Sequence, residues 1–235
     1  MIEDMRAVTM RRILVVLLVL AGLLVVADRA ALAIAERAAA TTIQHSEQLR
    51  QRPNVTIAGF PFLNQLVTGH YGKVRVRASE VLVGEDNRRL RISHLDVTLR
   101  HVHLEHDFAS GRAKSATASA LIGYHDLSDA LNTRFGYAGG GRVRATTTIS
   151  EAGVELPASA TAVVRLEGDT LTFADTQVEI GDVAVPPEVT SYFTGLFSDS
   201  ISLAGLPFDV HVQQLTARAD GVHVTLTAHG LTFSR

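Results

Sequence analysis

The chain has 235 residues, a formal net charge of −2 and no cysteine. It therefore has no disulfide and no thiolate chemistry, and a sequence pI of about 6.5 argues against nucleic acid as a partner. Charge is distributed unevenly, because Lys and Arg outnumber Asp and Glu by 12 to 8 over residues 34–115 but are outnumbered by 13 to 6 over residues 116–235. The basic half suits anionic lipid headgroups.

An apolar run over residues 13–27 follows two arginines and ends at an Asp-Arg pair. This run is shorter than the roughly 20 residues that span a bilayer, and it has the length of a signal-peptide core. The sequence Ala-Leu-Ala at 31–33 fits a cleavage site. We expect residues 1–33 to be a signal peptide or, if uncleaved, a membrane anchor, and residues 34–235 to be one exported domain at the extracytoplasmic face of the inner membrane or in the periplasm.

An alanine-rich helix is predicted over residues 28–49, and strict alternation of apolar and polar residues predicts half-buried antiparallel strands at 73–79, 95–100 and 222–227. The apolar parity changes between Ala78 and Val81, which indicates a bulge in a strongly bent sheet. The pattern is that of an α+β protein with a long meander of hairpins.

Short amphipathic helices are predicted at residues 62–67, after Asp126 as N-cap, and from Pro187 onward. Their apolar stripes either pack against the sheet as ordinary core or together line an apolar cavity. The first of these helices follows the hexapeptide IAGFPF at residues 57–62, which recurs as LAGLPF at 203–208. Glycine and proline are expected to end a strand in both copies, so shared local geometry is a better explanation of the repeat than internal duplication.

The segment from Val55 to Leu66, the GHYGKV sequence at 69–74 and the later GLPF at 205–208 resemble the LmeA-like phospholipid-binding proteins of actinobacterial envelopes. The resemblance runs from about Asp28 to the C-terminus. It implies a tubular lipid-binding fold, in which a long curved antiparallel sheet wraps a long helix. It also implies binding of anionic phospholipid such as phosphatidylinositol, a supporting part in lipomannan and lipoarabinomannan elongation, and no cofactor or catalytic residue.

The expected ligand site is an apolar cavity in a monomeric, non-enzymatic protein that contacts the membrane surface. Its predicted acyl-chain contacts are Phe60, Phe62, Leu63, Leu66, Tyr192, Phe193, Leu196, Phe197, Leu206 and Phe208. The predicted phosphate contacts are Lys73, Arg75 and Arg77. An alternative is that the groove receives an envelope glycosyltransferase and the protein acts as its accessory partner.

A metal-dependent hydrolase is an enzymatic alternative that rests on His101, His103 and His106, because two histidines on one strand face could reach one metal ion. Their spacing matches no recognised metal motif, and a wet strand face carrying polar histidines explains them more simply. The sequence also lacks nucleophile-elbow, zinc-protease, Walker and dinucleotide motifs. We therefore expect the protein to bind phospholipid without enzymatic activity and to hold no metal ion.

Overall fold

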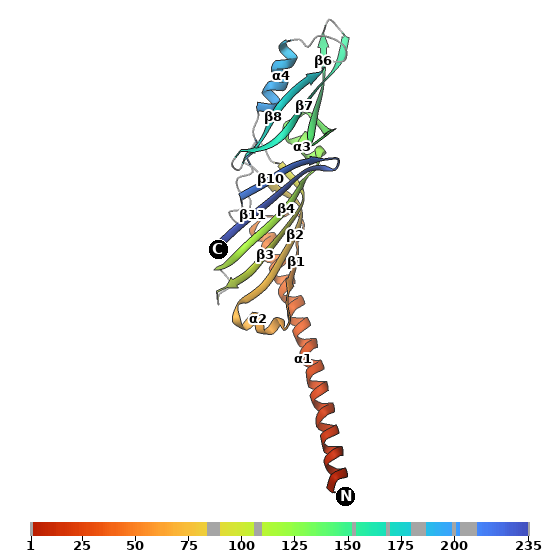
Figure 1. The fold of residues 1–235 in the computed structure, drawn as a ribbon, viewed down its shortest axis with the longest axis vertical. Helices are drawn as coiled ribbons and strands as arrows, with labels where there is room; N and C mark the ends of the chain where they lie inside the picture. Colours follow the sequence, from red (N-terminus) through yellow and green to blue (C-terminus); the bar gives the residue numbers. More distant parts are fainter. Residues whose placement is uncertain are drawn as a thin grey trace.

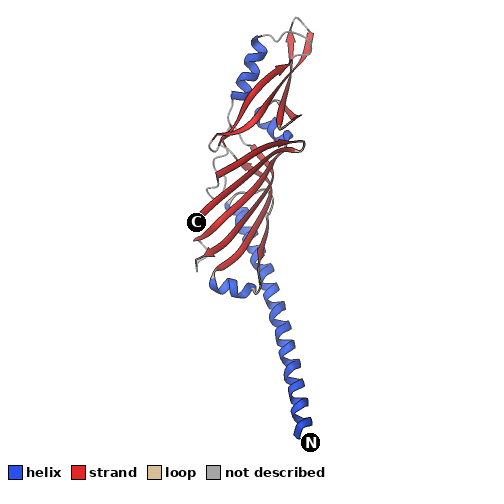
Figure 2. Cartoon of the chain, in the orientation of Figure 1, coloured by secondary structure: helices blue, strands red, loops and turns tan. Residues whose placement is uncertain are grey.

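The computed structural model describes residues 2–83, 90–105, 110–151, 154–167, 170–179, 187–198, 201–202 and 211–234. A long N-terminal helix precedes antiparallel strands, which confirms the expected α+β class (Figures 1 and 2). The strands form two separate sheets rather than one continuous meander. The sheets follow each other along the long axis of the molecule, and the helix projects from the end opposite the second sheet (Figure 1).

The four helices of the described chain are α1 (Ile2–Ser46), α2 (Phe62–Thr68), α3 (Tyr124–Leu131) and α4 (Pro187–Ser198). Sheet A has the spatial order β1 (Asn54–Ala58), β2 (His70–Val83), β3 (Leu90–Leu104), β4 (Ser110–Ile122), β11 (Gly221–Ser234) and β10 (His211–Arg218). Sheet B has the order β5 (Arg134–Gly139), β6 (Arg142–Glu151), β7 (Val154–Glu167), β8 (Thr170–Glu179) and β9 (Ile201–Ser202).

Helix α1 has two parts with different surroundings. Its apolar part is exposed on all sides, with Leu18 and Leu24 both 65% exposed, and Figure 1 shows it extending away from the sheets. Within the described chain, one segment, Arg11–Ser46, is long and apolar enough to cross a membrane. From Asp28 onward the helix packs on sheet A through small side chains, among them the buried Ala40. The expected helix over 28–49 is therefore the second half of a longer one.

Sheet A bends along a line of kinks close to its α2 end. Cα pairing between neighbouring strands skips one residue in each strand along this line, namely Gly72, His101, Lys114 and Gly230. His101 and Gly230 have left-handed backbones, with φ of 50° and 68°. Because the neighbouring strands change pleat parity at the same level, the register continues unbroken and the whole sheet turns.

The predicted parity change between Ala78 and Val81 is present, but it is not a bulge in one strand. Glu80 has φ of 56°, and the pairing passes from Ser79–His94 to Val81–Ile92 without a register shift. Strand β3 therefore changes parity together with β2. The alternation of one sequence segment reveals the kink and cannot reveal that the neighbouring strand shares it.

Helix α3 connects the two sheets and corrects one expectation. It begins at Tyr124 with Gly123 as N-cap, so Asp126 lies inside the first turn, where it accepts a hydrogen bond of 2.7 Å from the Ser93 hydroxyl. Predicting the N-cap at Asp126 was wrong because this carboxylate serves a partner on β3. The Tyr124 hydroxyl donates to the carbonyl oxygen of Arg218 on β10 at 2.7 Å, and burial raises the pKa of Tyr124 to about 12.

Candidate functional site

The first hexapeptide joins α1 to the open end of sheet A. Asp28 is only 2% exposed. Its carboxylate accepts a hydrogen bond from the backbone N–H of Leu63 at 2.8 Å and forms an ion pair with Arg29. Leu63 lies in the first turn of α2, where backbone N–H groups have no partner within the helix. Asp28 thus caps α2 from another helix. About two turns further along α1, Glu36 accepts the N–H of Ile57 at 2.8 Å and fixes β1 to the same helix.

Two glycines of the resemblance motif have positive φ and a close neighbour where a Cβ would lie. Gly59 has φ of +125°, and a Cβ there would lie 2.4 Å from the Gln65 side chain. Gly69 ends α2 with φ of +68°, and a Cβ there would lie 2.5 Å from the carbonyl oxygen of Leu104. Because the Leu104 N–H also donates to the Gly69 carbonyl oxygen at 2.9 Å, Gly69 fixes α2 against the last residue of β3.

The inner face of sheet A is apolar across its central strands. On β4 its residues are small, whereas β3 and β11 contribute larger branched side chains. The buried residues of this face on the three strands include Leu95, Val97, Leu99, Ala113, Ala116, Ala118, Ala120, Val222, Val224 and Leu226. The alanine-rich part of α1 packs against this core. These side chains have no hydrogen-bonding groups to satisfy, and in the structure they are packed as core.

The predicted acyl-chain contacts fall into two groups that the structure does not bring together. Phe60, Phe62, Leu63 and Leu66 lie at the α2 end of sheet A, whereas Tyr192, Phe193, Leu196 and Phe197 lie on α4 beside sheet B, at the other end of the molecule (Figure 1). Leu206 and Phe208, with the whole second hexapeptide, lie outside the described residues. Contact of any of these residues with lipid stays a prediction.

In the group at the α2 end of sheet A, neighbouring residues differ sharply in burial. Phe62 is 1% exposed and packs on Tyr71, with ring centroids 6.4 Å apart. Phe60 is 64% exposed, with the guanidinium of Arg29 5.3 Å from its ring centroid. Leu63 is half-buried, and Leu66 is exposed. Only part of this group is therefore core, and the rest faces outward.

The group on α4 is mostly buried in the hydrophobic core beside sheet B. Phe193 is fully buried and stacks near Phe197, with ring centroids 6.5 Å apart. Phe197 also lies 5.1 Å from Phe173 and 6.2 Å from Phe135, both on sheet B. Leu196 is buried as well, whereas Tyr192 is 44% exposed and its hydroxyl is 2.9 Å from that of Thr133. The helical stripe of α4 thus packs as a hydrophobic core.

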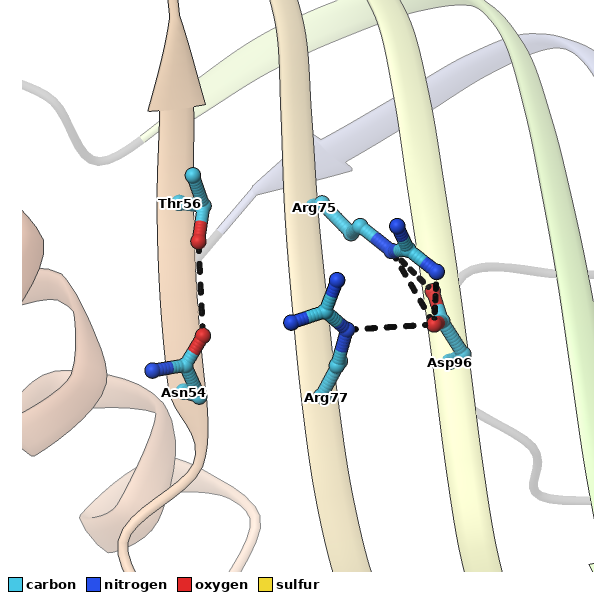
Figure 3. A network of polar contacts seen from close by, with 5 residues as sticks. All are labelled: Asn54, Thr56, Arg75, Arg77 and Asp96. Carbon is cyan, nitrogen blue, oxygen red and sulfur yellow. Dashed lines mark hydrogen bonds and ion pairs between the residues drawn. The ribbon is translucent and has the colours of Figure 1, made fainter.

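The predicted phosphate contacts lie on β2. Arg75 and Arg77 sit on the polar face of sheet A, and both bind Asp96 on β3 (Figure 3). The Nε of Arg75 is 2.8 Å from one oxygen of Asp96, and that of Arg77 is 3.3 Å from the other. Hydrogen bonds from Arg75 lower the pKa of Asp96 below its ordinary value, against the opposing effect of burial. Both arginines are thus paired, and among the described residues Lys73 has no ion pair.

Two surface clefts are lined mainly by polar groups. One, of about 800 Å³, lies where α3 meets β5, and its lining includes His125, Asp129 and Arg134. The other, of about 340 Å³, lies at the end of α1 and includes Glu47, Arg50 and Glu80. Neither contains a predicted acyl-chain contact.

His101 and His103 of β3 lie toward the α2 end of sheet A. The ring of His103 is 4.2 Å from that of His70, centroid to centroid, and His101 is exposed at the line of kinks. No group of three or more His, Cys, Asp or Glu able to hold a metal ion occurs in the described part of the chain, and His106 lies outside it.

The sequence profile of the LmeA-like phospholipid-binding family matches residues 26–227. The chain belongs to this family. The match begins two residues before Asp28 and so includes the α1–α2 contact, all of sheet B, and sheet A except the last part of β11. No curated protein and no solved structure matches the chain. Membership in the LmeA-like family supports phospholipid binding, and the long apolar start of α1 is compatible with a signal sequence or an anchor.

Sequence reasoning missed the roles of Asp28 and Glu36. Asp28 interrupts an apolar helix, and an acid at such a position needs a reason. Its partner, the backbone of Leu63, lies 35 positions away and carries no side-chain signal. The sequence shows that Asp28 interrupts the apolar helix, but it does not show which residue Asp28 contacts.

Proposed function

We propose that this LmeA-like protein holds a phospholipid, without transforming it, with an acyl chain against the inner face of sheet A. The family match over residues 26–227 is the observation on which the proposal rests. The apolar inner face supports it, because each methylene moved out of water onto such a surface contributes about 0.8 kcal/mol.

The lipid class that we propose is an anionic phospholipid of the phosphatidylinositol type, bound at the extracytoplasmic face of the inner membrane. The excess of Lys and Arg over residues 34–115 supports an anionic headgroup. Support of lipomannan and lipoarabinomannan elongation, with an envelope glycosyltransferase nearby, is the physiological role that the family resemblance suggests.

The test is native mass spectrometry of the full chain extracted from membranes, before and after adding phosphatidylinositol or phosphatidylcholine. Ala118→Leu fills the inner face at the centre of β4, whereas Thr117→Leu adds the same side chain to the exposed face of the same strand. We expect Ala118→Leu to lower the lipid-bound fraction several-fold and Thr117→Leu to leave it unchanged. Absence of bound lipid from the unaltered protein under all conditions would contradict the proposal.

We further propose that α1 stays attached as a membrane anchor. Cleavage after Ala33 would remove Asp28 and leave the N–H of Leu63 without its carboxylate, so the contact favours retention. Intact-mass measurement of the protein recovered from the envelope of its own cells should find the residues before Ile34. A mature N-terminus at Ile34 would exclude an anchor.

A further inference from the structure

The end of sheet A from which α1 emerges carries an exposed apolar tip. Phe60 is 64% exposed, Leu66 37% and Val67 83%, and all three lie on the hexapeptide and α2. This short segment is fixed to α1 by Asp28 and sits beside Arg29, the two residues that directly follow the exposed apolar run of α1. The tip is therefore held at the level where the apolar run of α1 ends.

The polar face of sheet A carries unpaired cations near the same end. Lys73 on β2 pairs in register with Arg100 on β3, and Arg112 and Lys114 lie on β4 within the next rows toward the α2 end. Among the described residues no ion pair involves any of the four. Like charges placed side by side on neighbouring strands repel each other, so an anionic surface that neutralises them is favourable.

On the same face, further from the α2 end, two arginines do have an acidic partner. Arg75 and Arg77 share the single carboxylate of Asp96 (Figure 3). The acidic excess of the chain lies in residues 116–235, which include all of sheet B at the far end of the molecule. Lys73, Arg100, Arg112 and Lys114 thus lie near the end of sheet A from which the exposed apolar helix emerges, and sheet B lies at the other end of the molecule (Figure 1).

We propose that the tip formed by Phe60, Leu66 and Val67 enters the boundary between headgroups and acyl chains of the bilayer that holds α1, and that Lys73, Arg100 and Lys114 face anionic headgroups there. Insertion of apolar side chains and attraction of nearby cations together are the usual basis of binding at a membrane interface. In this orientation the α2 end of sheet A contacts the membrane surface. This docking does not require a lipid bound within the domain.

The absence of cysteine allows a direct test with single labels on the full chain. Val67→Cys, labelled with nitrobenzoxadiazole, is reconstituted in vesicles of phosphatidylcholine and phosphatidylglycerol that contain lipids with nitroxides at a shallow acyl position. Tyr192→Cys, labelled in the same way, is the control, because Tyr192 is exposed but lies at the far end of the molecule. We expect strong quenching at position 67 and little at 192. A label at 67 that stays unquenched in protein that floats with the vesicles would overturn the proposal.

The electrostatic part is tested by charge reversal in the Val67→Cys background. Arg100→Glu combined with Lys114→Glu should reduce quenching at 67 several-fold in vesicles that contain phosphatidylglycerol, whereas Arg134→Glu, on an exposed residue of sheet B, should not. Equal quenching in the double variant and in its control would overturn the role of these cations. Because the readout is position at the membrane, its failure is distinguishable from failure to find a lipid in the domain by mass spectrometry.

Discussion

The carboxylate of Asp28 in α1 accepts the backbone N–H of Leu63 in α2 at 2.8 Å, and this contact joins the apolar helix to the domain. An acid at the N-terminus of a helix satisfies free N–H groups and interacts favourably with the helix dipole. Here the acid comes from a different helix, so Asp28 both caps α2 and holds α2 in position against α1. Its hydrogen bond ties the position of α2 to that of α1.

Asp28→Ala should therefore destabilise the α2 end of sheet A more than the rest of the molecule. We expect a fall of several degrees in the Tm of the purified full chain and faster hydrogen exchange in α2, whereas Asp28→Asn, which keeps an acceptor oxygen, should have a smaller effect. Asp129→Ala is the matched control, because that carboxylate is exposed on α3. Uniform exchange in α2 across all three variants would show that the contact does not hold the helix.

Gly69 should tolerate no side chain. Gly69→Ala forces a residue with φ of +68° to carry a Cβ close to the carbonyl oxygen of Leu104, and such strain costs about 1–3 kcal/mol. Gly72→Ala is the matched control, because it has ordinary φ and no atom within 4 Å of its added Cβ. Urea denaturation should show the loss for the first variant only. Similar midpoints for the two variants would refute the strain at Gly69.

The sequence predicted the local structure well where local patterns decide it. The alternating strands, the helix from Pro187 and the helix after Pro61 are all present, because apolar period and proline act over a few residues. The arrangement of these elements was not predictable in the same way. Phe60 and Phe193 carry similar local signals, and only the division into two sheets, set by long-range strand pairing, places them at opposite ends.

The same limit applies to the candidate site. Lys73, Arg75 and Arg77 alternate on one strand and have equivalent local patterns, but the two arginines share the carboxylate of Asp96 on β3, whereas Lys73 has no ion pair in the described chain. A partner on a neighbouring strand depends on register, which a sequence segment does not specify. The kink at His101 was hidden for the same reason, since the residues that share it, Gly72, Lys114 and Gly230, lie on other strands.

Stability should depend on pH through Asp96. Hydrogen bonds from Arg75 lower the pKa of Asp96 in the folded protein, so this group favours the folded state above its unfolded pKa of about 3.9. That contribution is lost as the pH falls below about 4 and through the lower folded-state pKa. We expect Asp96→Asn to lower the Tm at pH 7 and to differ less from the unaltered protein at pH 3. A constant difference in Tm from pH 7 to pH 3 would contradict the assignment.

Phe193 should be a core residue of sheet B, whatever lipid does elsewhere. It is fully buried beside Phe197, so Phe193→Ala removes a ring from a packed cluster and should cost about 3–5 kcal/mol of unfolding free energy. Tyr192→Ala, at the neighbouring exposed position, should cost far less, limited to its contact with Thr133. Urea denaturation of both variants, with and without added phosphatidylinositol, separates packing from lipid contact. If lipid restored the stability of Phe193→Ala selectively, α4 would be part of a lipid site after all, and the division of the predicted contacts into an outward-facing tip and a packed core would be wrong.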